Sequence, residues 1–139
     1  MYVLDTNVVS ELRKTRGGGA QRNVVAWAAA VPVATLYLSA ITVLELVQGL
    51  LPIERRDPGQ GAVLRTWLNR QVMPAFEDRI LPVDSEVAWR CAELHIPNPR
   101  GDRDAMIAAT ALVHGMTIVT RNVVDFAGTG VPIINPWNP

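Results

Sequence analysis

Five polar side chains in this sequence stand where an apolar segment ends, begins or is interrupted. Four of them are carboxylates and the fifth is an amide. Like charges brought close together cannot all stay ionised unless a cation offsets them. A set of oxygen ligands without His or Cys selects a hard ion, Mg²⁺ or Mn²⁺. The five residues are Asp5, Glu45, Asp104, Asn122 and Asp125.

The chemistry available to such a site follows from what a hard divalent ion does to its ligands. The ion lowers the pKa of a bound water molecule and polarises a phosphoryl oxygen. Both effects favour hydrolysis of a phosphodiester bond. The pattern therefore points to a nuclease, provided that the fold brings the five side chains together.

Short apolar runs separated by helical patterns are the elements that must position these side chains. A buried helix is predicted from about Asp102 to Gly115, because the segment is apolar on nearly every face. Ligands of open parallel sheets bind beyond the carboxyl ends of the strands, so strands sharing one parallel sheet would gather the acids at one edge. The predicted strands are Tyr2–Leu4, Leu36–Ser39, Ile80–Val83, Met116–Val119 and Val131–Trp137. The other predicted helices are Val8–Leu12, Asn23–Ala30, Ala40–Leu51, Ala62–Glu77 and Glu86–His95, with a polar loop over Pro52–Gly61.

Each acid also has a purely structural interpretation. Asp5 follows a strand and precedes a helix, so it could serve only as an N-cap, although Thr6 and Asn7 could cap equally well. Asp102 or Asp104 could likewise cap the helix that they open.

Glu45 is the only charge in its predicted helix and is costly there unless it meets water, a partner or a metal. Alternatively it belongs to one exposed polar stripe with Thr42 and Gln48. The sequence alone leaves this choice open.

Composition predicts one globular domain over residues 1–139, since nearly half the residues are hydrophobic. The 13 basic and 13 acidic residues cancel, which argues against a nucleic-acid binder that works through a broad basic field. The lone Cys91 cannot form an internal disulfide, and neither His fits a metal-binding spacing. No signal peptide or membrane-spanning run is visible, so we expect a cytoplasmic protein without a membrane partner.

Four motifs make the chain similar to the PIN-domain ribonucleases, and most of all to VapC-type toxins with their FitB-like branch. The resemblance extends from Tyr2 to Trp137. It implies a mainly parallel five-stranded sheet flanked by helices. It also implies an endoribonuclease that uses Mg²⁺ or Mn²⁺, forms a homodimer and is silenced in a complex with a cognate VapB-type antitoxin. The motifs are D-T-N at 5–7, L-S-A-I-T-V-L-E-L at 38–46, D-A-M-I-A-A-T-A at 104–111 and T-R-N-V-V-D-F at 120–126.

The resemblance places the acidic site of the family at Asp5, Glu45 and Asp104. In the mechanism that it implies, Asp5 and Asp104 hold the metal, and Glu45 orients or deprotonates the attacking water. Other polar residues would bond to these carboxylates or offset charge on the RNA phosphate. They are Thr6, Ser39, Arg103, Thr120 and Arg121.

The fourth acidic position of the family is often Asp, whereas this chain has Asn122 there, with Asp125 as the nearest carboxylate. In one interpretation Asn122 offers an amide oxygen, and Asn122 and Asp125 form a capping box. In the other, Asp125 turns into the site and restores the missing charge. We expect a shared role, with Asn122 nearer the metal and Asp125 at the rim.

Two other functional classes share this pattern. One is a structure-specific DNA nuclease, which needs additional elements to grip a duplex, and a chain of 139 residues has little room for them. The other is a PIN-like binding module whose acids no longer catalyse. The joint presence of Asp5, Glu45 and Asp104 argues against the second class.

Overall fold

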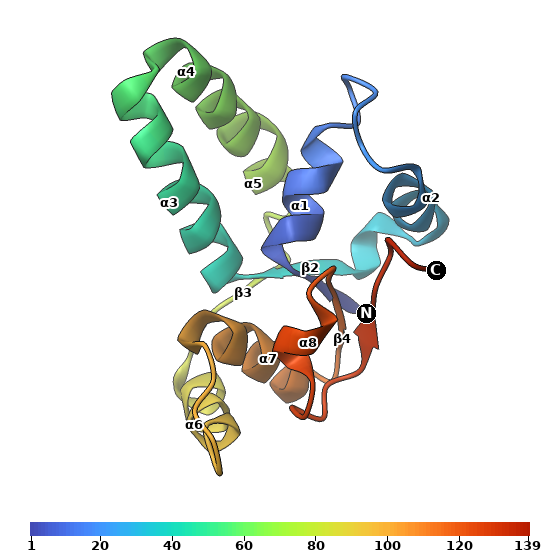
Figure 1. The fold of residues 1–139 in the computed structure, drawn as a ribbon, viewed down its shortest axis with the longest axis vertical. Helices are drawn as coiled ribbons and strands as arrows, with labels where there is room; N and C mark the ends of the chain where they lie inside the picture. The colour runs from blue at the N-terminus through green and yellow to red at the C-terminus, as the bar shows by residue number, and fades with distance from the viewer.

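A five-stranded parallel sheet forms the centre of the computed structural model, which describes all residues 1–139 (Figure 1). The strand order is β3-β2-β1-β4-β5, and every neighbouring pair is parallel. The predicted mainly parallel five-stranded α/β fold is confirmed. The strands are β1 (Tyr2–Leu4), β2 (Leu36–Ser39), β3 (Ile80–Leu81), β4 (Thr117–Val119) and β5 (Ile133–Ile134).

Helices cover both faces of the sheet, so the short strands have apolar side chains on both sides. Leu4 packs with Val8 and Val24 on one face, while Val3 packs with Ile107 on the other. Successive side chains of a strand point to opposite faces, which is why neighbours in β1 enter different cores. In Figure 1, α1 (Thr6–Arg13) and α2 (Arg22–Ala30) lie on one side of the sheet. Helices α6 (Ser85–Leu94) and α7 (Asp102–His114) lie on the other side.

Helix α7 is buried along most of its length, as its sequence predicts. Its one polar interruption, Thr110, is fully buried and donates its hydroxyl hydrogen to the carbonyl oxygen of Met106 at 2.7 Å. Gly115 closes the helix with a φ of 66°, a left-handed conformation that glycine adopts without steric cost. The N-cap is Gly101, and no side chain caps the helix there. The interpretation of Asp102 or Asp104 as the helix cap is therefore wrong.

The predicted polar loop over Pro52–Gly61 does not exist. Helix α3 (Ala40–Arg56) continues through Pro52, and α4 (Pro58–Trp67) begins after the single residue Asp57. Asp57 accepts a hydrogen bond from the Gln60 N–H at 3.1 Å, and Pro58 takes the first helical position, which suits its fixed φ. Packing between the two helices outweighs the local cost of a proline inside α3.

Other boundaries also differ from the sequence prediction: β3 ends at Leu81 rather than Val83, and β4 starts at Thr117 rather than Met116. The helix expected over Ala62–Glu77 starts earlier, and it continues through a π-helical segment η2 (Leu68–Val72) into α5 (Met73–Ala75). The strand expected over Val131–Trp137 contains only the two residues of β5. The remaining elements are the 3-10 turn η1 (Val33–Thr35) and the short helix α8 (Val123–Phe126). No helix combines the length and apolar character needed to cross a membrane.

The close approach of α3 and α4 depends on Gly61, and this generates a stability prediction. A Cβ at Gly61 would lie 2.5 Å from the Cα of Glu54, so Gly61→Ala should lower the free energy of unfolding by about 1–3 kcal/mol. Gly49, also helical, has open space around its missing Cβ. Gly49→Ala should therefore raise stability by up to about 1 kcal/mol. Urea unfolding of both variants measures the two changes. Changes of the same sign would contradict the role of Gly61 in the packing of α3 against α4.

Candidate active site

Asp5 lies at the carboxyl end of β1 and is 5% exposed. Its Oδ1 accepts a hydrogen bond from the Thr6 N–H at 2.8 Å. Its Oδ2 accepts from the Thr120 hydroxyl at 2.8 Å and from Asn7 Nδ2 at 3.1 Å. Asp5 does meet the first N–H of α1, but the bond from Thr120 comes from the neighbouring strand end. Its role is therefore wider than that of an N-cap.

The charge state of Asp5 reflects opposing effects. Burial raises the pKa of Asp5, and hydrogen bonds from Thr120 and Thr6 counteract part of this rise. The charges of Glu45 and Asp125 raise the pKa of Asp5 further. These two acids are therefore near enough for their charge to act on Asp5.

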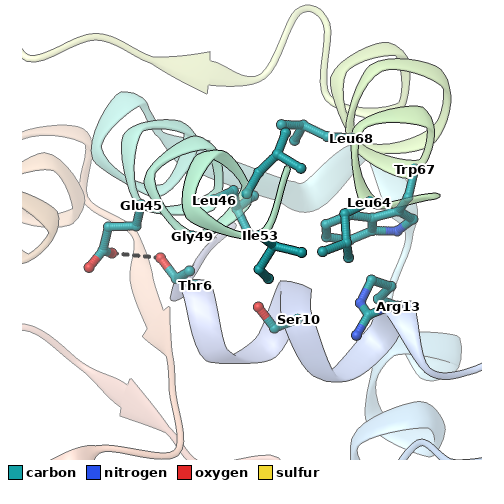
Figure 2. Close-up of a pocket in the computed structure, with 11 residues that line it drawn as sticks. Thr6, Ser10, Arg13, Glu45, Leu46, Gly49, Ile53, Leu64, Trp67 and Leu68 are labelled. Atoms are coloured by element: carbon teal, nitrogen blue, oxygen red, sulfur yellow. Dashed lines mark hydrogen bonds between the residues drawn. The ribbon is translucent and has the colours of Figure 1, made fainter. Parts of the chain in front are cut away.

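Glu45 reaches the same edge of the sheet from α3. Its Oε1 accepts a hydrogen bond from the Thr6 hydroxyl at 2.7 Å (Figure 2), and its side chain is 26% exposed. Thr42 is fully buried and its hydroxyl oxygen lies 3.3 Å from that of Thr6, while Leu44 is exposed. The alternative of a single exposed polar stripe through Glu45 and Thr42 is therefore wrong.

Asp104 lies in the first turn of α7, where it has no capping bond and is partly buried. Burial raises the pKa of Asp104 to about 6, and the charges of Asp125, Asp5 and Glu45 contribute to the rise. Asp102 differs, since its side chain is 85% exposed and lies 3.6 Å from His95 Nε2. Of the two acids that open α7, only Asp104 lies near Asp5, Glu45 and Asp125. These four carboxylates are called the acidic group below.

The turn after β4 carries Asn122, and α8, which follows it, carries Asp125. The buried Thr120 hydroxyl oxygen accepts a hydrogen bond from the Asn122 N–H at 2.9 Å. Asn122 precedes α8 but makes no side-chain cap, and its N–H is bonded to Thr120 rather than to Asp125. The capping-box interpretation of Asn122 and Asp125 is therefore wrong. Both side chains are exposed, and Asp125 is the first of the charges that raise the pKa of Asp104.

The supporting residues divide into those that touch the acids and those that do not. Thr6 and Thr120 bond to Glu45 and Asp5, as described above, and Arg103 Nη1 lies 3.9 Å from Glu45 Oε2. The predicted bond from Ser39 to a carboxylate is absent, because its oxygen caps α3 by accepting from the Ile41 N–H at 3.0 Å. The Arg121 guanidinium lies over the Trp137 ring, 5.5 Å from its centre.

A cleft adjoins the acidic group on the side of Glu45. It encloses about 230 Å³ between α1, α3 and α4, and Thr6 and Glu45 form one end of it (Figure 2). Arg13 and Trp67 line the other end, with the Arg13 guanidinium 5.9 Å from the centre of the Trp67 ring. The walls between are mostly aliphatic, and their side chains include those of Leu46, Leu50, Ile53, Leu64 and Leu68.

Comparison with known proteins agrees with this arrangement. Residues 2–129 match the PIN domain family. The chain belongs to the PIN-domain family. It is 41% identical to the VapC ribonuclease Y4jK of Sinorhizobium fredii, over 100% of this chain and 99% of that protein. The crystal structure of FitAcB from Neisseria gonorrhoeae has a TM-score of 0.87 at 35% identity, with both chains fully covered. A toxin-antitoxin complex from Klebsiella pneumoniae has a TM-score of 0.70 at 26% identity, over 98% of each chain.

One residue of this PIN domain makes site contacts that sequence reasoning did not assign. Asn7 donates from Nδ2 to Asp5, and its Oδ1 accepts from the Arg121 N–H at 3.2 Å. In the sequence Asn7 is only one of several residues able to cap α1. Its position two residues after Asp5 is the one signal that could have suggested a role at the site.

The donor set of the PIN domain fits a hard divalent ion held partly through water. All the ligand atoms offered at this edge are oxygens, and burial together with the charges of the neighbouring acids raises the pKa of Asp104. No three carboxylate, imidazole or thiol side chains lie close enough together to hold one ion between them. Mg²⁺ usually keeps several water ligands and takes only one or two carboxylates directly, so it does not require three of these side chains in direct contact.

The raised pKa of Asp104 predicts a pH-dependent stability difference. The unfolded chain releases this proton near the ordinary value of 3.8, and the folded chain releases it near 6. The folded state therefore loses stability as the pH rises through this window, and the full loss is present above it. Asp104→Asn should raise the free energy of unfolding by about 1–2 kcal/mol near pH 7.5, after allowance for solvent screening, and by almost nothing near pH 4.

Asp102→Asn is the matched control, because Asp102 occupies the same turn but is largely exposed. Urea unfolding at both pH values, without divalent ions, gives the comparison. An equal gain for Asp104→Asn at the two pH values would contradict the electrostatic explanation.

Proposed function

We propose that this VapC-type PIN domain is a divalent-metal-dependent endoribonuclease of the cytoplasm and the toxin of a toxin–antitoxin pair. The observation that carries the proposal is the meeting of Asp5, Glu45, Asp104 and Asp125 at one sheet edge, with the pKa of Asp104 raised to about 6. A protein gains no stability from crowding four acids in this way. Such crowding is characteristic of sites that bind a cation for catalysis.

The carboxylates divide into two groups by their surroundings. Asp5 is fixed by three hydrogen bonds, and Asp104 projects from a buried helix, so these two side chains are the best positioned to hold Mg²⁺ or Mn²⁺. When bound, the ion would lower the pKa of a water molecule and polarise a phosphoryl oxygen of RNA. Asp125, or the amide oxygen of Asn122, would complete the set from the rim.

Glu45 is the residue best suited to orient the attacking water or to take its proton. The hydrogen bond from the Thr6 hydroxyl fixes Oε1, while Oε2 is only loosely paired with Arg103 at 3.9 Å. Oε2 can therefore accept a bond from water. Arg103 lies near enough to offset charge that develops on the phosphate. Arg121 is less available for this role in the present arrangement, since its guanidinium lies against Trp137.

The partner assignment rests on the names of the relatives. The similar Klebsiella pneumoniae structure is a toxin-antitoxin complex, and the VapC name of Y4jK denotes a ribonuclease. We therefore propose that a VapB-type antitoxin binds and silences this chain, and that two copies of the chain associate as a homodimer.

Cleavage assays on the purified chain test the proposed activity. We expect single-stranded RNA to be cut in the presence of Mg²⁺ or Mn²⁺, with activity lost on chelation, and flapped DNA to remain intact. Cleavage of flapped DNA but not RNA would establish the alternative of a DNA nuclease. An absence of cleavage on both substrates in the presence of metal would favour a binding module.

Glu45→Gln tests the role of the glutamate within that assay. The amide is nearly isosteric but cannot take a proton, so cleavage should fall by about 10²–10⁴-fold while the fold persists. Glu54→Gln is the control, since Glu54 lies on the same helix but pairs with Arg65 at 2.7 Å, away from the acidic group. If Glu45→Gln cuts RNA as fast as wild type, Glu45 is not the base.

The fourth position is tested by Mn²⁺ titration of Asp125→Ala and Asn122→Ala in a calorimeter. Loss of a group that contacts the ion or its water should weaken Mn²⁺ binding about tenfold or more. We expect this result for Asp125→Ala, because its charge acts directly on Asp104. If Asn122→Ala leaves Mn²⁺ affinity, RNA cleavage and stability all unchanged, Asn122 has no place in the site.

A further inference from the structure

The amide of Asn7 joins the ends of two neighbouring strands through three contacts. Its Nδ2 donates to Asp5 Oδ2 at 3.1 Å and to Thr120 Oγ1 at 3.3 Å. Its Oδ1 accepts from the Arg121 N–H at 3.2 Å. Asp5 follows β1, whereas Thr120 and Arg121 follow β4. The Asn7 side chain therefore bridges the carboxyl ends of β1 and β4, where the acidic group lies.

Apart from the Thr120 hydroxyl, which donates to Asp5 Oδ2 at 2.8 Å, the turn after β4 is held to the end of β1 through Asn7. The Thr120 hydroxyl accepts from the Asn122 N–H, and Asn7 accepts from the Arg121 N–H. Both backbone donors of the turn are therefore bonded to side chains rather than to a neighbouring strand. The turn leads directly into α8, which carries Asp125.

We infer that Asn7 is a positioning residue that ties Asp5 to the turn that carries Asn122 and leads into α8 with Asp125. It does so by presenting a donor to the carboxylate and an acceptor to the turn at the same time. The part of this inference that concerns metal binding and catalysis rests on the proposed function. The part that concerns the turn does not.

The chemistry of the contacts requires an amide at position 7. A carboxylate there would accept from the Arg121 N–H, but it cannot donate to Asp5 and would repel it. A hydroxyl is shorter and cannot make the donor and acceptor contacts together. Asn7→Asp therefore removes the bonds donated to Asp5 and Thr120 while keeping the side-chain size, and Asn7→Ala removes all three contacts.

Hydrogen exchange of individual backbone amides, followed by NMR on the full chain, tests the turn. In Asn7→Ala the Arg121 amide should exchange at least about tenfold faster than in wild type, because its acceptor is gone. The Thr120 amide is the internal control, since it donates to the carbonyl oxygen of Ile134 at 2.9 Å and should keep its protection. Equal acceleration of both amides would indicate general destabilisation and would overturn the positioning role.

Mn²⁺ titration and RNA cleavage test the consequence for the site. Loss of a residue that orients a ligand typically costs about 10–100-fold in metal affinity or activity. We expect a loss in this range for both Asn7→Ala and Asn7→Asp, with cleavage falling in kcat more than in KM. Asn23→Ala is the matched control, because Asn23 is also half-buried and its amide donates to the carbonyl oxygen of Trp137 instead. It should leave Mn²⁺ affinity unchanged.

The failure of this inference can be told apart from the failure of the proposed function. If wild type cuts no RNA, the proposed function fails, but the exchange of the Arg121 amide still decides the role of Asn7. If wild type is active and Asn7→Ala matches it in Arg121 exchange, Mn²⁺ affinity and kcat, the inference is wrong. Should Asn7→Ala fail to fold, Asn7→Ser is measured in the same three ways and judged by the same results.

Discussion

The burial of the Asp5 carboxylate is the constraint on which the rest of the site depends. A carboxylate removed from water is costly unless hydrogen bonds replace its hydration. Asp5 meets this requirement with donors from α1 and from the end of β4. The β4 donor is available only because β4 lies beside β1 in the sheet, and the Asp5 N–H itself bonds to Val119 at the end of β4. The pairing of these two strands therefore creates the site.

The other acids are brought to the carboxyl ends of β1 and β4 by elements that are themselves well packed. Asp104 comes from a helix buried against the sheet, and Glu45 comes from α3, whose first turn also packs against the sheet. Burial of Asp104, together with the charges of Asp125, Asp5 and Glu45, therefore raises the pKa of Asp104 to about 6. Repulsion between the carboxylates lowers the free energy of unfolding when no cation is bound. A bound cation would relieve this repulsion, which favours its binding to the folded chain.

Much of this arrangement was predictable from the sequence because it depends on local patterns. Buried strands are short apolar runs, and the buried helix α7 is apolar on nearly every face with glycine at its end. The acids stand where these patterns break. The hairpin of α3 and α4 was not predictable in this way. Local signals around Pro52 indicate a loop, whereas α3 continues through Pro52 and packs closely against α4 where Gly61 meets Glu54.

The sequence by itself determined the short buried strands, the buried helix α7 and the places where Asp5, Glu45 and Asp104 interrupt the apolar pattern, since periodicity is a local property. Only the tertiary structure decided which polar groups touch. The bond from Thr120 to Asp5 joins residues 115 positions apart, and Asn7 contacts Thr120 across 113 positions. Such contacts depend on which strands become neighbours. That choice is made by the packing of the whole chain, so a short motif cannot reveal it.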